Sequence, residues 1–152
     1  VATIVKHLSG NMISRWTNFL TEDGEKDWRN RDSEFENTIK TKAEMLELWE
    51  KGWKILFNAL DQINEENLHQ TIFIRGEKHS VADAVLRQLA HYPYHIGQIV
   101  YIAKMLKNES WNTLSIARNQ SKDFNHLMLQ QQNSSPVCYA NSDEVREDYK
   151  AE

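Results

Sequence analysis

Two histidines, His91 and His95, are the residues whose type and spacing point most directly to chemistry. Residues four apart lie on one face of a helix with Cβ atoms roughly 5–6 Å apart, so these two imidazoles can bind one metal ion. Gln88 and Gln98 extend the pair into a polar strip, and buried polar groups need the partners that a metal site provides. The alternative is that both rings only hydrogen-bond within the core, because isolated pairs of this spacing are common.

Catalytic zinc usually has three protein ligands and an open position, so the pair needs a third histidine. The remaining candidates are His7, His69, His79 and His126. His7 is the best placed, because it lies at the edge of an apolar helical face and can point into a bundle. A zinc-protease mechanism is not supported, since Tyr92 follows His91 where that motif has its glutamate base. Pro93 either is a tolerated kink or bends the helix so that a pocket opens beside the imidazoles.

Three segments with apolar residues at helical spacing must position these side chains. They span about residues 4–20, 41–63 and 80–106. The third is apolar almost all round from Tyr94 to Leu106, so it needs neighbours on several sides. These features predict a helical bundle.

The starts of the second and third helices carry capping signals. Thr41 with Glu44, and Ser80 with Asp83, have the residue types and the three-residue spacing of N-terminal caps.

The remaining segments are less regular. Residues 71–74 predict a short strand, followed by a turn at 75–77. Residues 110–129 predict a loop and a short helix, and a polar, charged tail follows. We therefore expect one domain over residues 1–129 and a loosely packed tail over 130–152.

Composition narrows the function classes. The net charge of −4 is spread without a basic face, which argues against a nucleic-acid partner. The longest apolar run is too short to cross a bilayer, so we expect no membrane segment. Cys138 is the single cysteine, which fits a reducing cytoplasm, and it has no basic neighbour that would make it a nucleophile. Val1 already lies inside an apolar pattern, so we expect the sequence to begin partway through a longer protein.

Four separated segments carry a resemblance that covers roughly residues 1–128: VKHLSGNM at 5–12, DGEK at 23–26, IRGE at 74–77 and QLAHYPYHIGQIVY at 88–101. They resemble a branch of the DinB-like (YfiT-like) superfamily, a branch without a firmly assigned reaction. The resemblance implies an all-α, DinB-like four-helix bundle whose first family helix is missing from this sequence. It also implies a divalent metal bound by three histidines, which match His7, His91 and His95.

Related DinB-like proteins include thiol-dependent transferases and isomerases that use low-molecular-weight thiols such as bacillithiol, and hydrolase-like members; many are homodimers. The resemblance therefore implies a small-molecule substrate and a homodimer. Imidazole ligands suit zinc, nickel or iron. Such an ion can create a hydroxide, hold a thiolate or polarise a carbonyl.

Further residues are candidates for roles around the metal. Two lie within one helical turn of a proposed ligand and could orient a ring or a water: Asn11 and Gln98. Two aromatic residues could donate hydrogen bonds or simply pack in the core: Tyr92 and Tyr94. Three arginines could bind a carboxylate, or pair with neighbouring acids such as Asp32 or Glu34: Arg29, Arg31 and Arg75.

Two functions follow from these observations. The first is a metal-dependent enzyme that transfers a thiol to a small electrophile or hydrolyses a small substrate. The alternative is a non-catalytic helical bundle in which the histidines are structural or sense metal.

Overall fold

The computed structural model describes residues 1–132 of the 152-residue chain. These residues are mostly helical, with α1 (Ala2–Trp16), α2 (Lys42–Leu60), α3 (Val81–Lys107) and α4 (Ser121–Gln132), and two short 3₁₀ helices, η1 (Asp32–Phe35) and η2 (Asn108–Ser110). Strands β1 (Thr71–Ile74) and β2 (Glu77–Ser80) pair as an antiparallel hairpin, an addition to the predicted all-α class. The chain divides into two compact units, Val1–Asn108 and a second that begins at Glu109.

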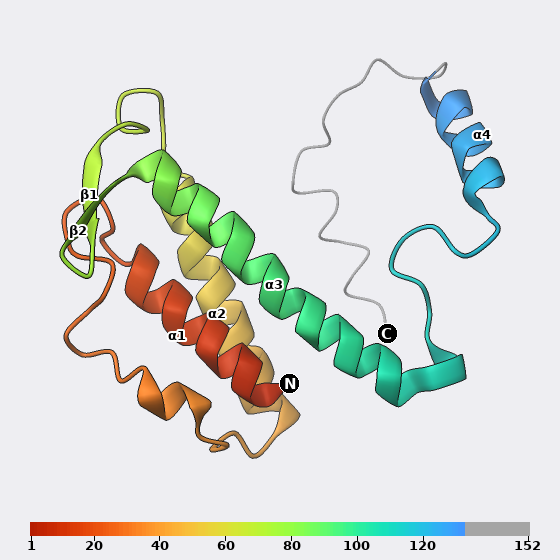
Figure 1. Ribbon diagram of the computed structural model, residues 1–152, viewed down its shortest axis with the longest axis horizontal. Coiled ribbons are helices and arrows are strands. Elements are labelled where there is room, and N and C mark those ends of the chain that lie inside the picture. Colours follow the sequence, from red (N-terminus) through yellow and green to blue (C-terminus); the bar gives the residue numbers. More distant parts are fainter. Residues whose placement is uncertain (133–152) are drawn as a thin grey trace. The chain divides into compact units, whose positions relative to one another are not determined.

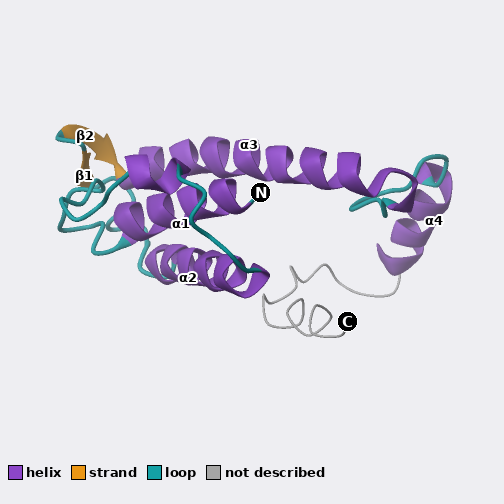
Figure 2. Ribbon diagram, turned by 90° about the horizontal axis from the view of Figure 1, so that it is seen from below, coloured by secondary structure: helices purple, strands orange, loops and turns teal. Residues whose placement is uncertain are grey.

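In the first unit α1 lies between α2 and α3 (Figure 2). The chain runs in the same direction along α1 and α2 and in the opposite direction along α3 (Figure 1). The contact between α1 and α2 is close at Gly52, where an added Cβ would lie 3.0 Å from the Cα of Ser9. The Ser9 hydroxyl donates to the carbonyl of Leu48 at 2.7 Å, so the two helices are also joined by a hydrogen bond.

The predicted helix starts are confirmed. Ser80 Oγ accepts from the backbone N–H of Asp83, and the Asp83 carboxylate accepts from Ser80, which forms a complete capping box. Thr41 Oγ1 accepts from the backbone N–H of Glu44 at 3.1 Å. The helix ends were predicted less well, because α1 stops at Trp16 and α2 at Leu60, before the predicted residues 20 and 63.

One apolar core joins the three helices and the hairpin. Its buried members are Leu8, Met12, Trp16, Phe19, Leu56, Ala59, Ile72, Ile74, Val81, Ala84 and Tyr92. Phe19 belongs to it although it lies beyond the end of α1, because the chain turns at Asn18, which has a φ of 49°. The apolar pattern therefore continues past the helix into the turn.

Asp23 ties the loop after α1 to the hairpin. Its Oδ1 accepts from the backbone N–H groups of Glu25 and Arg75, and its Oδ2 accepts from that of Gly76, all at 2.7–2.8 Å. Arg75 and Gly76 have φ values of 57° and 75°, as expected for a two-residue type I′ turn. The hydrogen bonds from these backbone groups outweigh the effect of burial and lower the pKa of Asp23 below its ordinary value of 3.8.

We predict that Asp23→Ala lowers the free energy of unfolding by about 1–2 kcal/mol at pH 7, because three backbone donors lose their acceptor. Since the native pKa is depressed, the stabilisation is full above the ordinary pKa and is lost as pH falls through the native value. Urea unfolding of both proteins at several pH values should therefore show the difference shrinking in acid. Asp27→Ala, at an exposed position in the same loop, is the control and should change stability little. An equal loss at every pH would contradict the prediction.

The second unit contains the connection that follows η2 and then α4. The sequence predicted a loop and a short helix here, over residues 110–129. Its apolar side chains Phe124, Leu127 and Met128 are exposed. α4 continues to Gln132, and the rest of the predicted tail, with Cys138, lies outside the described residues. Among the described helices, none combines the length and the apolar content needed to cross a bilayer.

Candidate metal centre

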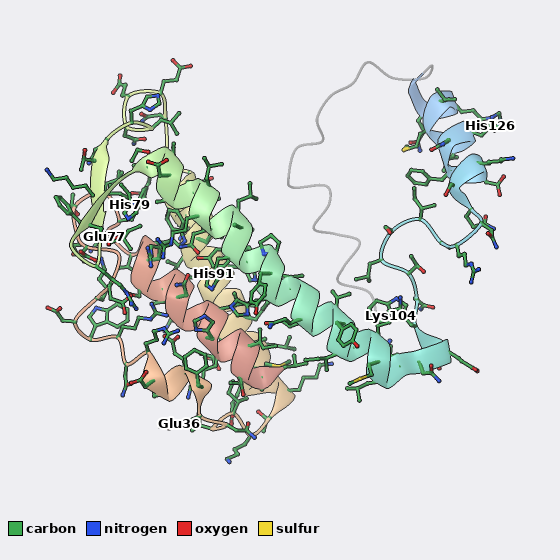
Figure 3. All side chains as sticks on the ribbon, in the orientation of Figure 1. Glu36, Glu77, His79, His91, Lys104 and His126 are labelled. Carbon is green, nitrogen blue, oxygen red and sulfur yellow. The ribbon has the colours of Figure 1, made fainter. Side chains whose placement is uncertain are left out.

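The rings of His7, His91 and His95 lie together between α1 and α3, and Figure 3 shows His91 on the side of α3 that faces α1. Ring centroids are 5.5 Å apart for His7 and His91, 5.0 Å for His7 and His95, and 4.8 Å for His91 and His95. One ring nitrogen from each residue lies within 4.8 Å of the others, so the three residues could hold a metal ion. His7 is buried and the other two are half-buried.

Each of the three rings contacts an oxygen through its Nδ1 atom. His7 Nδ1 lies 2.9 Å from a carboxylate oxygen of Glu34. His91 Nδ1 lies 3.2 Å from Oε1 of Gln88, and His95 Nδ1 lies 2.8 Å from Oε1 of Gln98. These oxygens only accept, so each Nδ1 carries the hydrogen and each Nε2 keeps its lone pair.

The Nε2 atoms are therefore free to bind a cation. Those of His91 and His95 lie 3.1 Å apart, and two unprotonated nitrogens at that distance repel each other unless a positive charge lies between them. Around a tetrahedral ion with metal–nitrogen bonds of about 2.0–2.1 Å, ligand nitrogens lie roughly 3.3 Å apart. The separation of this pair is close to that value.

The surroundings of His91 and His95 keep these two rings neutral. Burial, followed by the charges of neighbouring groups, lowers the pKa of His91 to about 4. Burial also lowers the pKa of His95, against the opposing effect of its hydrogen bond with Gln98. Neutral imidazoles are the form that binds metal, so both side chains are ready to coordinate at neutral pH.

Glu34, on η1, supports His7 from outside the three-histidine group. Arg29 binds it in a bidentate manner, with Nε–Oε1 at 2.8 Å and Nη2–Oε2 at 2.9 Å, and also donates to Glu25 at 2.9 Å. Burial alone would raise the pKa of Glu34, but the hydrogen bonds from His7 and Arg29 outweigh it and keep the pKa below its ordinary value. A carboxylate that accepts from a ligating histidine fixes the ring and raises its basicity. Phe35 stacks on the other side of His7, with ring centroids 5.0 Å apart.

Gly10 makes room for this carboxylate. It lies one turn after His7 on α1, and an added Cβ would lie 2.3 Å from Oε1 of Glu34 and 2.6 Å from its Cδ. A side chain at this position cannot coexist with Glu34 in its present place. Glycine has a low helix propensity, and its presence at position 10 of α1 is explained by the space that Glu34 needs.

We predict that Gly10→Ala displaces the Glu34 carboxylate and weakens zinc binding about 10–100-fold, the usual cost of losing such an outer hydrogen bond. Competition with a chromophoric chelator measures the affinity. Gly97→Ala is a matched control on α3, because nothing lies within 4 Å of its added Cβ. It should leave zinc affinity unchanged and raise stability by up to about 1 kcal/mol through helix propensity. Equal zinc affinities for the two variants would contradict this account of Gly10.

The polar and aromatic residues predicted around the metal fall into two sets. Gln98 contacts His95, the arrangement expected of a residue that orients a ring, and its amide nitrogen donates to the hydroxyl of Tyr94 at 3.2 Å. Tyr92, in contrast, is buried in the core, where its hydroxyl donates to Asn11 at 3.1 Å and accepts from Trp16 at 2.9 Å. Asn11 and Tyr92 thus bond to each other and not to a proposed ligand.

The three arginines have different environments. The side chain of Arg29 is buried and forms ion pairs with Glu34 and Glu25. Of the two roles considered for this arginine, it therefore pairs with neighbouring acids. The guanidinium of Arg31 lies 5.0 Å from the ring centroid of Phe35. Arg75 is exposed in the hairpin turn and donates to Glu25 at 3.2 Å.

The candidate metal group among the described residues does not include the other histidines. His69 is exposed in the connection after α2, and His126 is exposed on α4. His79 lies on β2, where it pairs with Ile72 across the hairpin.

Sequence analysis did not identify Glu34 as a partner of His7. The two residues are 27 apart, and Glu34 lies in a charged connection with no helical periodicity that would fix its direction. Gln88 was recognised as part of the polar strip, and its contact with His91 follows from the three-residue spacing on α3.

Comparisons with known proteins give a family but no characterised relative. No curated protein matches the chain, and no solved structure matches it. A family model described as "Protein of unknown function (DUF1572)" matches residues 1–120, which include all three histidines and Glu34. The chain therefore belongs to the DUF1572 family.

Proposed function

We propose that this protein binds one divalent metal ion through His7, His91 and His95 and uses it in a reaction of a small molecule, either transfer of a thiol to an electrophile or hydrolysis. One observation carries the proposal. Each of the three rings directs Nδ1 to an outer oxygen, which leaves three Nε2 lone pairs for one cation. Such a donor set suits zinc, nickel or iron.

Three neutral ligands leave an ion its full double charge, which acidifies a water or thiol bound to it. Among the described residues the candidate metal group contains no carboxylate and no cysteine. The proposed nucleophile is therefore a water from solvent or a second substrate, such as a low-molecular-weight thiol. The role of the chain is to orient the histidines through Glu34, Gln88 and Gln98, while burial keeps His91 and His95 neutral.

The resemblance of residues 1–128 to DinB-like proteins supports the same proposal. It brings with it a homodimer, a thiol such as bacillithiol as one substrate, and a four-helix bundle completed by a further helix. The single cysteine of the sequence favours a cytoplasmic location. Each of these is a proposal for this chain.

Elemental analysis of protein purified without a histidine tag tests the metal site. We expect close to one zinc, nickel or iron ion per chain, and uptake of cobalt by the metal-free protein with a visible spectrum typical of nitrogen ligands. Turnover is then measured on electrophiles with bacillithiol and on a panel of esters. A protein that takes up none of these metals contradicts the proposal. Full occupancy without turnover on either panel favours the structural or metal-sensing alternative.

A further inference from the structure

Arg15 is a buried cation without a partner. The residue is 5% exposed, and its Nε and Nη1 atoms have no hydrogen-bond acceptor among the described residues. A buried polar group without a partner is destabilising, and more so when it carries a charge. A guanidinium in this position therefore needs an acceptor that residues 1–132 do not supply.

Three carboxylates of the connection between α1 and α2 are already engaged by other donors. Asp23 accepts three backbone N–H groups. Glu25 is paired with Arg29 and Arg75, one carboxylate oxygen for each arginine. Glu34 is held by Arg29 and His7. Arg15 thus lies beside a network of ion pairs without forming one.

The position of Arg15 relates it to the metal centre. His7, Asn11 and Arg15 follow one another at four-residue spacing, so they lie on one face of α1, and all three are buried. His7 and Arg15 are separated by roughly 12 Å along the helix axis at 1.5 Å per residue. A second positive charge comes from α3, where Arg87 lies one turn before His91 on the face that also carries His95.

The positive charges of Arg15 and Arg87 influence each other. Burial lowers the pKa of Arg15, and the charge of Arg87 adds to this effect, so the two guanidinium groups lie close enough to repel each other. Two positive charges that repel each other beside a site for a divalent cation form a region that favours anions.

The third guanidinium nitrogen of Arg15, Nη2, is the atom that an anion from solvent can reach. Unlike Nε and Nη1, Nη2 is not a buried atom. It forms no hydrogen bond with the described residues and keeps access to solvent. Both bidentate edges of a guanidinium include Nη2, one with Nε and the other with Nη1. An anion that reaches Nη2 therefore also meets one of the two unsatisfied buried donors, in the geometry that carboxylates and phosphates prefer.

We propose that Arg15, assisted by Arg87, binds an anionic group of the substrate, a carboxylate or a phosphate, while the reacting part of the same molecule lies at the three histidines. This inference rests on the proposed metal centre and narrows the substrate to a small molecule with an anionic end. The anion satisfies the Arg15 donors that the described part of the chain leaves unpaired, and it fixes the distance between the bound end and the reacting end.

Hydroxamates, which chelate zinc, provide the test on zinc-loaded protein. Two series of increasing chain length are compared by calorimetry, one ending in a methyl group and one in a carboxylate. At the best length we expect the carboxylate to tighten binding at least about tenfold, the value of a charge-assisted contact to arginine. A third series ending in a phosphonate decides between the two anions, because the larger gain identifies the preferred group.

Three variants assign the effect. Arg15→Met keeps the length of the side chain without its charge, and Arg87→Gln removes the exposed charge. Both should reduce the gain, Arg15→Met to less than about twofold. Lys78→Gln, which removes an exposed charge on β2, should leave the gain as it is in the wild type.

The outcomes separate this inference from the proposed function. Failure of the protein to bind zinc and the methyl-ended hydroxamates overturns the metal centre, and the inference with it. Binding of the methyl-ended series without any gain from an anionic end overturns the inference alone. A gain that persists in Arg15→Met also overturns it, and a lower melting temperature of that variant would then identify Arg15 as a structural residue.

Discussion

In the His91→Ala protein, zinc affinity should fall by at least about 1,000-fold, because one of only three protein ligands is lost. The stability of the metal-free protein should change by less than about 1 kcal/mol. His91 is half-buried, its hydrogen bond to Gln88 is its main polar contact, and its removal relieves the repulsion between its Nε2 and that of His95. Chelator competition measures the affinity, and thermal unfolding with and without zinc measures the stability.

This pair of measurements separates the two functions. A metalloenzyme loses metal and turnover in His91→Ala while the metal-free fold stays intact. If His91 is structural, His91→Ala lowers the stability of the metal-free protein and there is no turnover to lose. His69→Ala is the control, since this exposed histidine lies outside the three-histidine group, and it should behave as wild type in every assay. Unchanged zinc affinity in His91→Ala would exclude the three-histidine site.

Glu34→Gln should be the most destabilising single change at the site. Among the described residues it leaves the buried side chain of Arg29 with Glu25 as its one carboxylate partner, and breaking a buried ion pair costs about 3–5 kcal/mol. The same change removes the carboxylate that orients His7, so zinc affinity should also fall about 10–100-fold. Chemical denaturation and chelator competition measure the two effects.

A double substitution separates these effects. In Glu34→Gln with Arg29→Gln no charge is left unpaired between the two positions, so most of the lost stability should return. Zinc affinity should stay low, because His7 still lacks its carboxylate partner. Glu36→Gln, an exposed position at the end of η1, is the control for loss of a negative charge in this segment. Recovery of zinc affinity in the double variant would show that Glu34 acts only through stability.

The sequence predicted those features of the fold and of the metal centre that residues close together in the chain determine. The caps at Thr41 and Ser80 were identified because hydrogen bonds within three residues determine them. The strand at residues 71–74 was identified because strand-forming residues directly precede a turn sequence. The facing positions of His91 and His95 follow from helical spacing in the same way. The approach of His7 to this pair was expected from its apolar face and from the family resemblance, and the three rings lie together in the structure.

Contacts across long, irregular connections were not predictable. Glu34 reaches His7 from a 3₁₀ helix inside the segment between α1 and α2, where no repeat sets the direction of a side chain. The role of Gly10 depends on the same contact, since only the approach of Glu34 makes a side chain at this position unacceptable. The early end of α1 has a related cause, because Phe19 remains in the core after the backbone has left the helix.

The placement of Glu34 on η1 has a consequence for the dynamics of the chain. Because an ion at the histidines strengthens the contact between His7 and Glu34, metal binding should favour the ordered state of the whole segment between α1 and α2. A protease that cuts at exposed bonds near Trp28 should then cleave the metal-free protein faster than the zinc-loaded one. The occupancy of the metal centre would in this way control the lifetime of a surface segment that supplies none of its ligands.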